Sequence, residues 1–377
     1  MDLSFSPEQK LIKDAAREFL EKECPADLVR EMEEDELGYS PGLWRKMGEL
    51  GWPGLIIPEK YGGSGGTFLD LVPLLEEMGR YLAPVPFFPT VILGALSLME
   101  AGSEAQKQKI LPEVATGRLI LTMALIEPDP LYHVSGIHLQ ASPQGNGFLL
   151  YGTKIFVPYA HVADYLLCAA RTENVDGKGD VITLFLIDRE SPGIRCEPLK
   201  TVDWGRQCEV TFDGTKVPAG NIIGKAGEGW PVVQKVMEQA IVAQCALMIG
   251  GAEKVLEMTV AHAKRRVQFG RPIGSFQAVQ HRCANMLVDL DGARFVVYEA
   301  AWRLSQALPC ALEASTAKAW VNQAYQRICA NGHQVHGGIG VIKDQEMYLY
   351  SRSAKAAETL WGDTAVHREM VARELGL

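Results

Sequence analysis

The stretch Lys264-Arg-Arg-Val-Gln-Phe-Gly-Arg-Pro-Ile-Gly-Ser-Phe-Gln-Ala-Val-Gln-His-Arg-Cys-Ala-Asn-Met286 joins two helical patterns at a short break. Before the break, apolar or small residues recur at the spacing of one helix face over residues 252–267. Three helix breakers then end this pattern: Gly270, Pro272 and Gly274. Ser275 is the candidate N-cap of a second helix. The sequence therefore predicts two helices that meet at a tight corner.

The corner is rich in cations and amides. A guanidinium presents a fork that fits phosphate oxygens, and a helix N-terminus adds unpaired N–H groups. This composition favours a phosphate or pyrophosphate site, although a solvated corner with a few salt bridges has the same composition. The residues concerned are Arg265, Arg266, Arg271, Gln268, Gln277 and Gln280.

The composition is that of a globular protein large enough for two or three domains. The chain has 377 residues, 47% of them hydrophobic, and a formal net charge of -9. No basic run stands out, so we expect no nucleic-acid partner. Neither a cationic and apolar leader nor an apolar run long enough to span a membrane is evident, so we expect a cytoplasmic protein. No C-x-x-C pair occurs among the 8 cysteines, so no zinc site or disulfide framework is expected.

The hydrophobic pattern changes twice along the chain. Residues 1–117 and 227–377 show helical periodicity, and Ser6-Pro7 has the form of a helix start. Residues 118–226 hold short strand-like runs such as Val181–Ile187, separated by turn residues such as Gly145-Asn146-Gly147. These patterns predict an α+β chain in which a β domain lies between two helical domains.

Two blocks of the sequence resemble the acyl-CoA dehydrogenase family. One is Arg266-x-Gln-Phe269-Gly-x-Pro-Ile-x-x-x-Gln277. The other is Gln334-Val-His-Gly337-Gly338-Ile-Gly340, followed by Arg352-Ser-Ala-Lys355. The resemblance covers essentially the whole chain. It implies an N-terminal helical domain (1–117), a middle β-barrel-like domain (118–226) and a C-terminal four-helix bundle (227–377).

The resemblance also implies an FAD cofactor. In the family, the arginine and phenylalanine of the first block contact the diphosphate region, and the later glutamine faces FAD. Phe156 is either stacked against the flavin ring or simply a packed strand residue. The cofactor-binding residues expected on this basis are Arg266, Phe269, Gln277, Gln334, Gly337, Gly338, Phe156 and Leu125.

The family's reaction needs a carboxylate that removes the α-proton of an acyl-CoA thioester, and burial tunes its pKa. This chain has Trp361 where the commonest family pattern, Tyr-Glu-Gly-Thr, has its glutamate. The other position used in the family falls on Ala240. Neither side chain accepts a proton. The candidate bases are therefore Glu238 and Asp363, and Glu358 is a weaker third candidate. Glu238 and Glu358 also fit the role of solvent-facing helix carboxylates.

The middle region departs from the family as well. Relatives carry Thr-Glu-Pro-x-Ala-Gly-Ser-Asp where this chain keeps only Glu127-Pro128, followed by Asp129–Tyr132. Relatives also carry Lys-x-Trp-Ile-Thr-Asn, which here reads Lys154-Ile-Phe-Val-Pro158-Tyr. The proline lacks both the threonine hydroxyl and the backbone N–H donor.

Three interpretations remain open. The chain is an FAD-dependent acyl-CoA dehydrogenase with a displaced base, or one subunit of a heteromeric enzyme, or a nitroalkane-oxidase-like flavoenzyme that uses Asp363. We favour the second, in which this subunit completes an FAD site or is structural, within a homo- or hetero-tetramer. The resemblance implies lipid or steroid CoA esters as substrates and electron-transferring flavoprotein as acceptor. His333 and His336 have metal-pair spacing, but no third ligand is evident and no metal is expected.

Overall fold

The computed structural model describes residues 5–128, 133–173, 180–202 and 205–377. The departures expected at Asp129–Tyr132 lie outside the described residues. The chain divides into two compact units, which we call the helical unit (1–30, 67–83 and 241–377) and the sheet unit (31–66 and 84–240). The domain boundaries expected from the sequence stay a prediction, because each unit draws on more than one of those segments.

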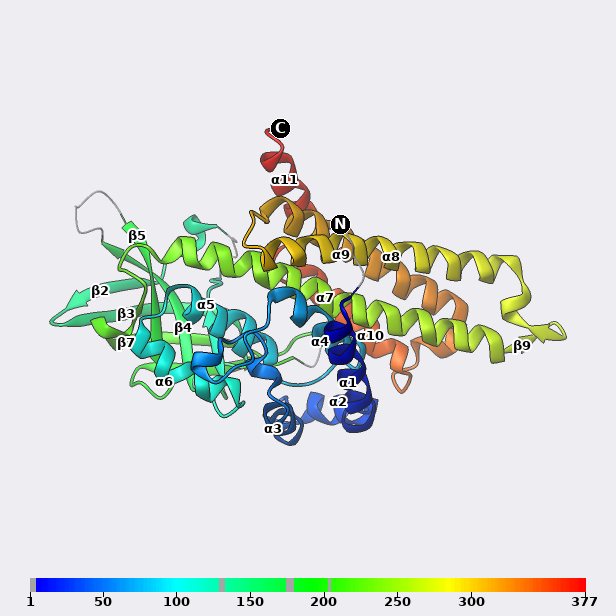
Figure 1. Ribbon diagram of the computed structural model, residues 1–377, viewed down its shortest axis with the longest axis horizontal. Helices are drawn as coiled ribbons and strands as arrows, with labels where there is room; N and C mark the ends of the chain where they lie inside the picture. Colours follow the sequence, from blue (N-terminus) through cyan, green and yellow to red (C-terminus); the bar gives the residue numbers. More distant parts are fainter. Residues whose placement is uncertain (1–4, 129–132, 174–179, 203–204) are drawn as a thin grey trace. The chain divides into compact units, whose positions relative to one another are not determined.

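The helical unit begins as the sequence predicts. Ser6 caps α1 by accepting a hydrogen bond from the backbone N–H of Gln9, whose side chain accepts one from the Ser6 N–H in return. Helices α8 and α9 pack against each other, and α10 and α11 both pack on α9 (Figure 1). The elements of this unit are α1 (Pro7–Glu23), the start of α2 (Ala26–Glu34), α4 (Phe68–Arg80), the second part of α7 (Gly229–Arg265), β9 (Val267–Gln268), β10 (Arg271–Pro272), α8 (Gln277–Ser305), α9 (Ala311–His336), α10 (Glu346–Thr359) and α11 (Thr364–Glu374).

Two glycines allow α4 and α7 to cross at very short range. A Cβ atom on Gly250 would lie 1.7 Å from the backbone oxygen of Glu76, and one on Gly79 would lie 1.9 Å from that of Leu247. Any side chain at either position would push the two helices apart. Close backbone approach is therefore the reason for glycine in both helices.

The sheet unit contains one sheet with the strand order β6-β7-β3-β2-β4-β5-β8, and β1 pairs with β4 in parallel. β2 and β3 form a hairpin around Gly145 (φ +58°) and Asn146, at the turn expected from the sequence. The strands are β1 (Leu121–Ala124), β2 (Gln140–Gln144), β3 (Gly147–Pro158), β4 (Tyr165–Glu173), β5 (Asp180–Asp188), β6 (Ile194–Leu199), β7 (Gln207–Pro218) and β8 (Ile222–Ile223). The helices are α3 (Pro41–Glu49), α5 (Leu96–Ala101) and α6 (Glu104–Ala115), with a π-helix at Phe88–Ala95.

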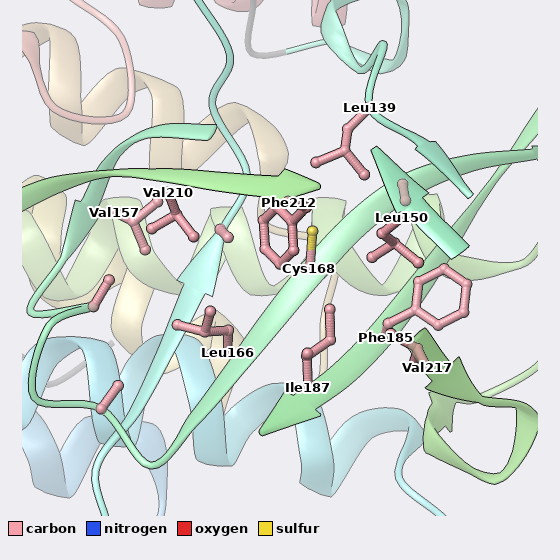
Figure 2. Packing of buried hydrophobic residues seen from close by; sticks show 14 of the residues in the cluster. Leu139, Leu150, Val157, Leu166, Cys168, Phe185, Ile187, Val210, Phe212 and Val217 are labelled. Atoms are coloured by element: carbon pink, nitrogen blue, oxygen red, sulfur yellow. The ribbon is translucent and has the colours of Figure 1, made fainter. Parts of the chain in front are cut away.

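The core of the sheet unit is formed by alternate residues of these strands. Along β7, Cys208, Val210 and Phe212 point inward while their neighbours are half-buried or exposed. Phe185 of β5 and Leu150 of β3 lie in the same cluster (Figure 2). The runs read as strands in the sequence, including Val181–Ile187, are strands of this sheet.

Helix α7 is long and apolar enough to cross a membrane by length and composition. No membrane span was expected from the sequence, where charged residues such as Glu238 and Glu253 bound the apolar run. An 18-residue window of the helix is 67% buried within the protein, which is the behaviour of a core helix.

The corner between α7 and α8 differs from the prediction in one detail. The N-cap of α8 is Phe276, without a side-chain cap, and the predicted cap Ser275 is wrong. Ser275 ends a short 3-10 turn, and its hydroxyl donates to the backbone oxygen of Pro272 at 2.7 Å. The hydroxyl is therefore used within the turn rather than by the helix.

Candidate functional site

The corner carries a two-stranded hairpin at the point where α7 ends, labelled β9 in Figure 1. Phe269 is at its tip, with φ +54° and 91% of its side chain exposed. The guanidinium of Arg271 lies over the ring of Phe276, 4.1 Å from the centroid. A bulky residue held in the left-handed region and exposed to this degree is a strained arrangement that is typical of a binding surface.

Predicted residues Gln334, Gly337 and Gly338 lie at the end of α9. Gly337 ends the helix with φ +65°, and a Cβ on either glycine would meet no atom within 4 Å. All three residues are exposed. The backbone here is therefore open to a ligand at close range.

The histidines beside these glycines are used within the protein. The His336 ring stacks on that of His262, with centroids 4.4 Å apart, and its Nδ1 lies 2.9 Å from the Gly332 oxygen. His333 bonds to the hydroxyl of Ser351. Within the described ranges, no group of three or more His, Cys, Asp or Glu residues could hold a metal ion.

The turn between α10 and α11 contains Trp361, at the usual base position, and the candidate base Asp363 two residues later. Trp361 has φ +62° and is only 9% exposed. Asp363 is the N-cap of α11, and its Oδ1 accepts the backbone N–H of Val366 at 2.9 Å. The Asp363 carboxylate thus caps the N-terminus of α11, a position at which aspartate is among the preferred residues.

His367 of α11 is buried and hydrogen bonds through Nε2 to the Trp361 backbone oxygen at 2.9 Å. Burial lowers the pKa of His367 to about 4, an effect that exceeds the opposite influence of this hydrogen bond. The ring is therefore neutral near pH 7 and donates its Nε2 proton.

Acid is expected to destabilise the fold through His367. An unfolded histidine titrates near pH 6.5, so the unfolded chain binds more protons between pH 6.5 and about 4, and stability falls as the pH falls through that window. The expected loss is about 2 to 3 kcal/mol in the free energy of unfolding. Urea unfolding of the wild type and of His367→Gln at both ends of the window measures it. An equal pH dependence in the two proteins would contradict the assignment.

In the sheet unit, a buried ion pair joins β3 to the segment that follows β1, next to predicted site residues. Lys154 is fully buried, and its Nζ donates to Glu127 at 2.6 Å and to the backbone oxygen of Leu125 at 3.0 Å. Glu127 also accepts the backbone N–H groups of His138 and Leu139, each at 3.0 Å. The pair therefore fixes Leu125 at the end of β1.

The register of β3 against β7 shifts between Lys154 and Val157, as at a β-bulge. Phe156 lies in this bulge with φ +53° and is 45% exposed. Because the Ile155 N–H donates to the Ile126 oxygen at 2.8 Å, the bulge lies beside the segment that follows Leu125. Phe156 and Leu125 thus lie on neighbouring segments of the sheet unit, one on β3 and one directly after β1.

The predicted Glu238 lies on the first part of α7 and is half-buried, while Ala240 is fully buried. Sequence reasoning did not identify the Lys154–Glu127 pair or the buried Lys318 of α9. Two features of the sequence could have indicated these buried lysines. Lys154 interrupts a strand-like run, and Lys318 lies between Ala317 and Ala319 on a helix. A charged residue in an apolar pattern needs a buried partner.

The chain was compared with protein-family models, with curated proteins and with solved structures. Models of the acyl-CoA dehydrogenase N-terminal, middle and C-terminal domains match residues 6–118, 122–215 and 227–376. The probable acyl-CoA dehydrogenase YngJ of Bacillus subtilis is 31% identical over 100% of both chains. Subunit CarC of the caffeyl-CoA reductase-Etf complex of Acetobacterium woodii is 30% identical over 97% of both.

A solved structure, the ChsE4-ChsE5 complex from Mycobacterium tuberculosis, matches with a TM-score of 0.91 and 30% identity over 100% of this chain and 99% of that chain. These matches show an oxidoreductase that uses FAD. The chain belongs to the acyl-CoA dehydrogenase family, as its two sequence blocks indicated, and its helical, β and helical domain order is that of the family.

Proposed function

We propose that this chain is one subunit of a heteromeric acyl-CoA dehydrogenase whose sister subunit supplies the carboxylate base. One observation carries the proposal. The turn between α10 and α11 is well defined, but the residue at the usual base position is Trp361. The nearby Asp363 carboxylate caps α11 by accepting the Val366 N–H. Indole has no lone pair for a proton at neutral pH.

The residues present fit the cofactor. We propose that Arg266, Phe269 and Gln277, together with the open backbone at Gly337–Gly338, hold the diphosphate and adenine side of FAD. A dinucleotide is bound by guanidinium and amide donors to its phosphates, by an exposed aromatic face and by backbone that approaches it closely. Gln334 of the same helix end, and Phe156 and Leu125 of the sheet unit, complete the proposed set. FAD, when bound, supplies the hydride acceptor.

Two carboxylates remain candidates for a self-sufficient enzyme. Asp363→Asn keeps an oxygen that can cap α11 but removes the charge, so turnover should be unchanged if Asp363 is only a cap. Loss of turnover, with FAD still bound, would instead make Asp363 the base and favour the nitroalkane-oxidase-like reading. Glu238→Gln is the matched variant for the second candidate.

The assembly is also part of the proposal. CarC is named as part of a complex with Etf, and ChsE4-ChsE5 is a complex of two named chains. We propose by analogy a tetramer with a sister subunit, in the cytoplasm, acting on a lipid or steroid CoA ester with electron-transferring flavoprotein as acceptor. The three-domain division at 1–117, 118–226 and 227–377 is proposed on the same basis.

Flavin content tests the subunit proposal directly. The full chain purified alone is expected to hold well under one FAD per chain by its visible spectrum, because part of the site is missing. Co-expression with a sister chain that carries the usual glutamate should restore full occupancy and bleaching by acyl-CoA. A fully loaded homomer that is bleached by an acyl-CoA on its own would contradict the proposal.

A further inference from the structure

The C-terminal end of α10 is closed by side chains. The last four carbonyl groups of a helix have no partner within the helix. Here the Ala356 oxygen accepts from the Thr359 hydroxyl at 3.0 Å. The Ala357 oxygen accepts from Lys318 Nζ at 2.6 Å, and the Glu358 oxygen accepts from Asn322 Nδ2 at 3.2 Å.

Two of these donors form a buried unit on α9. Lys318 and Asn322 are one helical turn apart and are fully buried, and Lys318 Nζ also donates to Asn322 Oδ1 at 2.7 Å. The negative end of the α10 dipole stabilises a cation at this place. Burial nevertheless lowers the pKa of Lys318 to about 8, so charging this amine inside the protein carries a cost. An apolar residue at position 318 would avoid that cost but would leave the Ala357 carbonyl and the Asn322 side-chain oxygen without their donor.

The residues that follow α10 are fixed at three further points. Trp361 and Gly362 both have left-handed backbone conformations, with φ +62° and +101°. His367 binds the Trp361 oxygen, and a Cβ on Gly362 would lie only 3.0 Å from His367 Nε2. Asp363 ends the turn by capping α11. The backbone of this turn is therefore held at its start, at Trp361 and at the beginning of α11.

We infer that Lys318, Asn322 and His367 act together as a buried clamp that sets the position of residue 361. They are positioning residues, because they bind the backbone around Trp361. The clamp explains how a strained tryptophan is held at a position that relatives use for their base. Only the placement of residue 361 beside the flavin rests on the proposed function.

Fluorine NMR of the full chain labelled with fluorotryptophan tests the clamp. The chain has 7 tryptophans, and Trp361→Phe identifies the line of residue 361. Lys318→Met should shift or broaden that line and leave the other lines in place. The matched control is Lys355→Met, which removes a lysine from the exposed face of α10, where it pairs with Glu358, and should leave every line unchanged.

Asn322→Ala is a milder variant, because it keeps Lys318 and its bond to the Ala357 oxygen and removes only the amide of residue 322. It tests the clamp if Lys318→Met does not fold. A Trp361 line that stays unchanged in the folded variants would overturn the clamp. So would a shift of all tryptophan lines in Asn322→Ala, which would indicate a general structural role. In the wild-type complex loaded with FAD, a Trp361 line that does not respond to FAD would count against the proposed function and leave the clamp intact.

Discussion

Glu127→Leu is expected to destabilise the protein by about 3 to 5 kcal/mol, because it leaves the fully buried Lys154 without its carboxylate. The backbone N–H groups of His138 and Leu139 would lose their acceptor at the same time. The free energy of unfolding, measured in urea, gives the effect. Since the pair fixes Leu125, we also expect weaker FAD retention in the variant that remains folded.

The double variant Glu127→Leu with Lys154→Met separates charge from packing. Replacing both members of a buried ion pair is often far less damaging than removing one. We therefore expect the double variant to be more stable than Glu127→Leu alone. If it is the less stable of the two, the orphaned lysine is not the origin of the loss.

Arg80→Met is expected to cost a similar amount, about 3 to 5 kcal/mol, for a related reason. Arg80 is the C-terminal residue of α4, its side chain is 9% exposed, and it binds Glu257 through both terminal nitrogens. Carboxylates of Glu77 and Glu253 lie 3.8 Å from its guanidinium nitrogens. Four cations face four carboxylates in this cluster, so losing Arg80 leaves an excess negative charge. The members are Lys13, Arg17, Arg80, Arg294, Glu76, Glu77, Glu253 and Glu257.

Arg327→Met is the matched control. Arg327 also binds a carboxylate through two nitrogens, that of Asp289, but its side chain is 46% exposed. Water screens such a pair, so its loss should cost no more than about 1 kcal/mol. Thermal or urea unfolding of both variants gives the comparison. Equal losses would show that burial does not set the strength of the Arg80 cluster.

The hydrophobic pattern predicted most of the fold, because helix and strand periods differ strongly in long segments. The start of α1 and the β2–β3 turn followed from single residues whose conformational preferences are strong, Ser6 and Gly145. Ser275 failed as a cap because its hydroxyl had a competing acceptor, the Pro272 oxygen, which only the folded turn brings near. Local sequence does not show such competition.

The site was predicted in part. Phe269 and Gly337 were found because their neighbours form a specific block, and the structure shows both exposed in left-handed backbone. The partners of Lys154 and Lys318 were not predictable from spacing. One partner lies 27 residues away and the other, the Ala357 oxygen, lies 39 residues away, so tertiary structure alone brings them together.

The helical unit is assembled from three separated parts of the chain, and this has a consequence for its synthesis. Tyr298 donates to Glu76 across 222 residues, and Tyr350 donates to the Arg80 oxygen across 270. These contacts cannot form until Tyr298 and Tyr350 themselves have left the ribosome. The sheet unit, whose residues end at 240, is complete much earlier. Contacts of such long range slow folding. Until they form, the charged side chains of α1 and α4 that are buried in the finished protein remain exposed to solvent. Nascent chains stalled before α8 should therefore depend on chaperones.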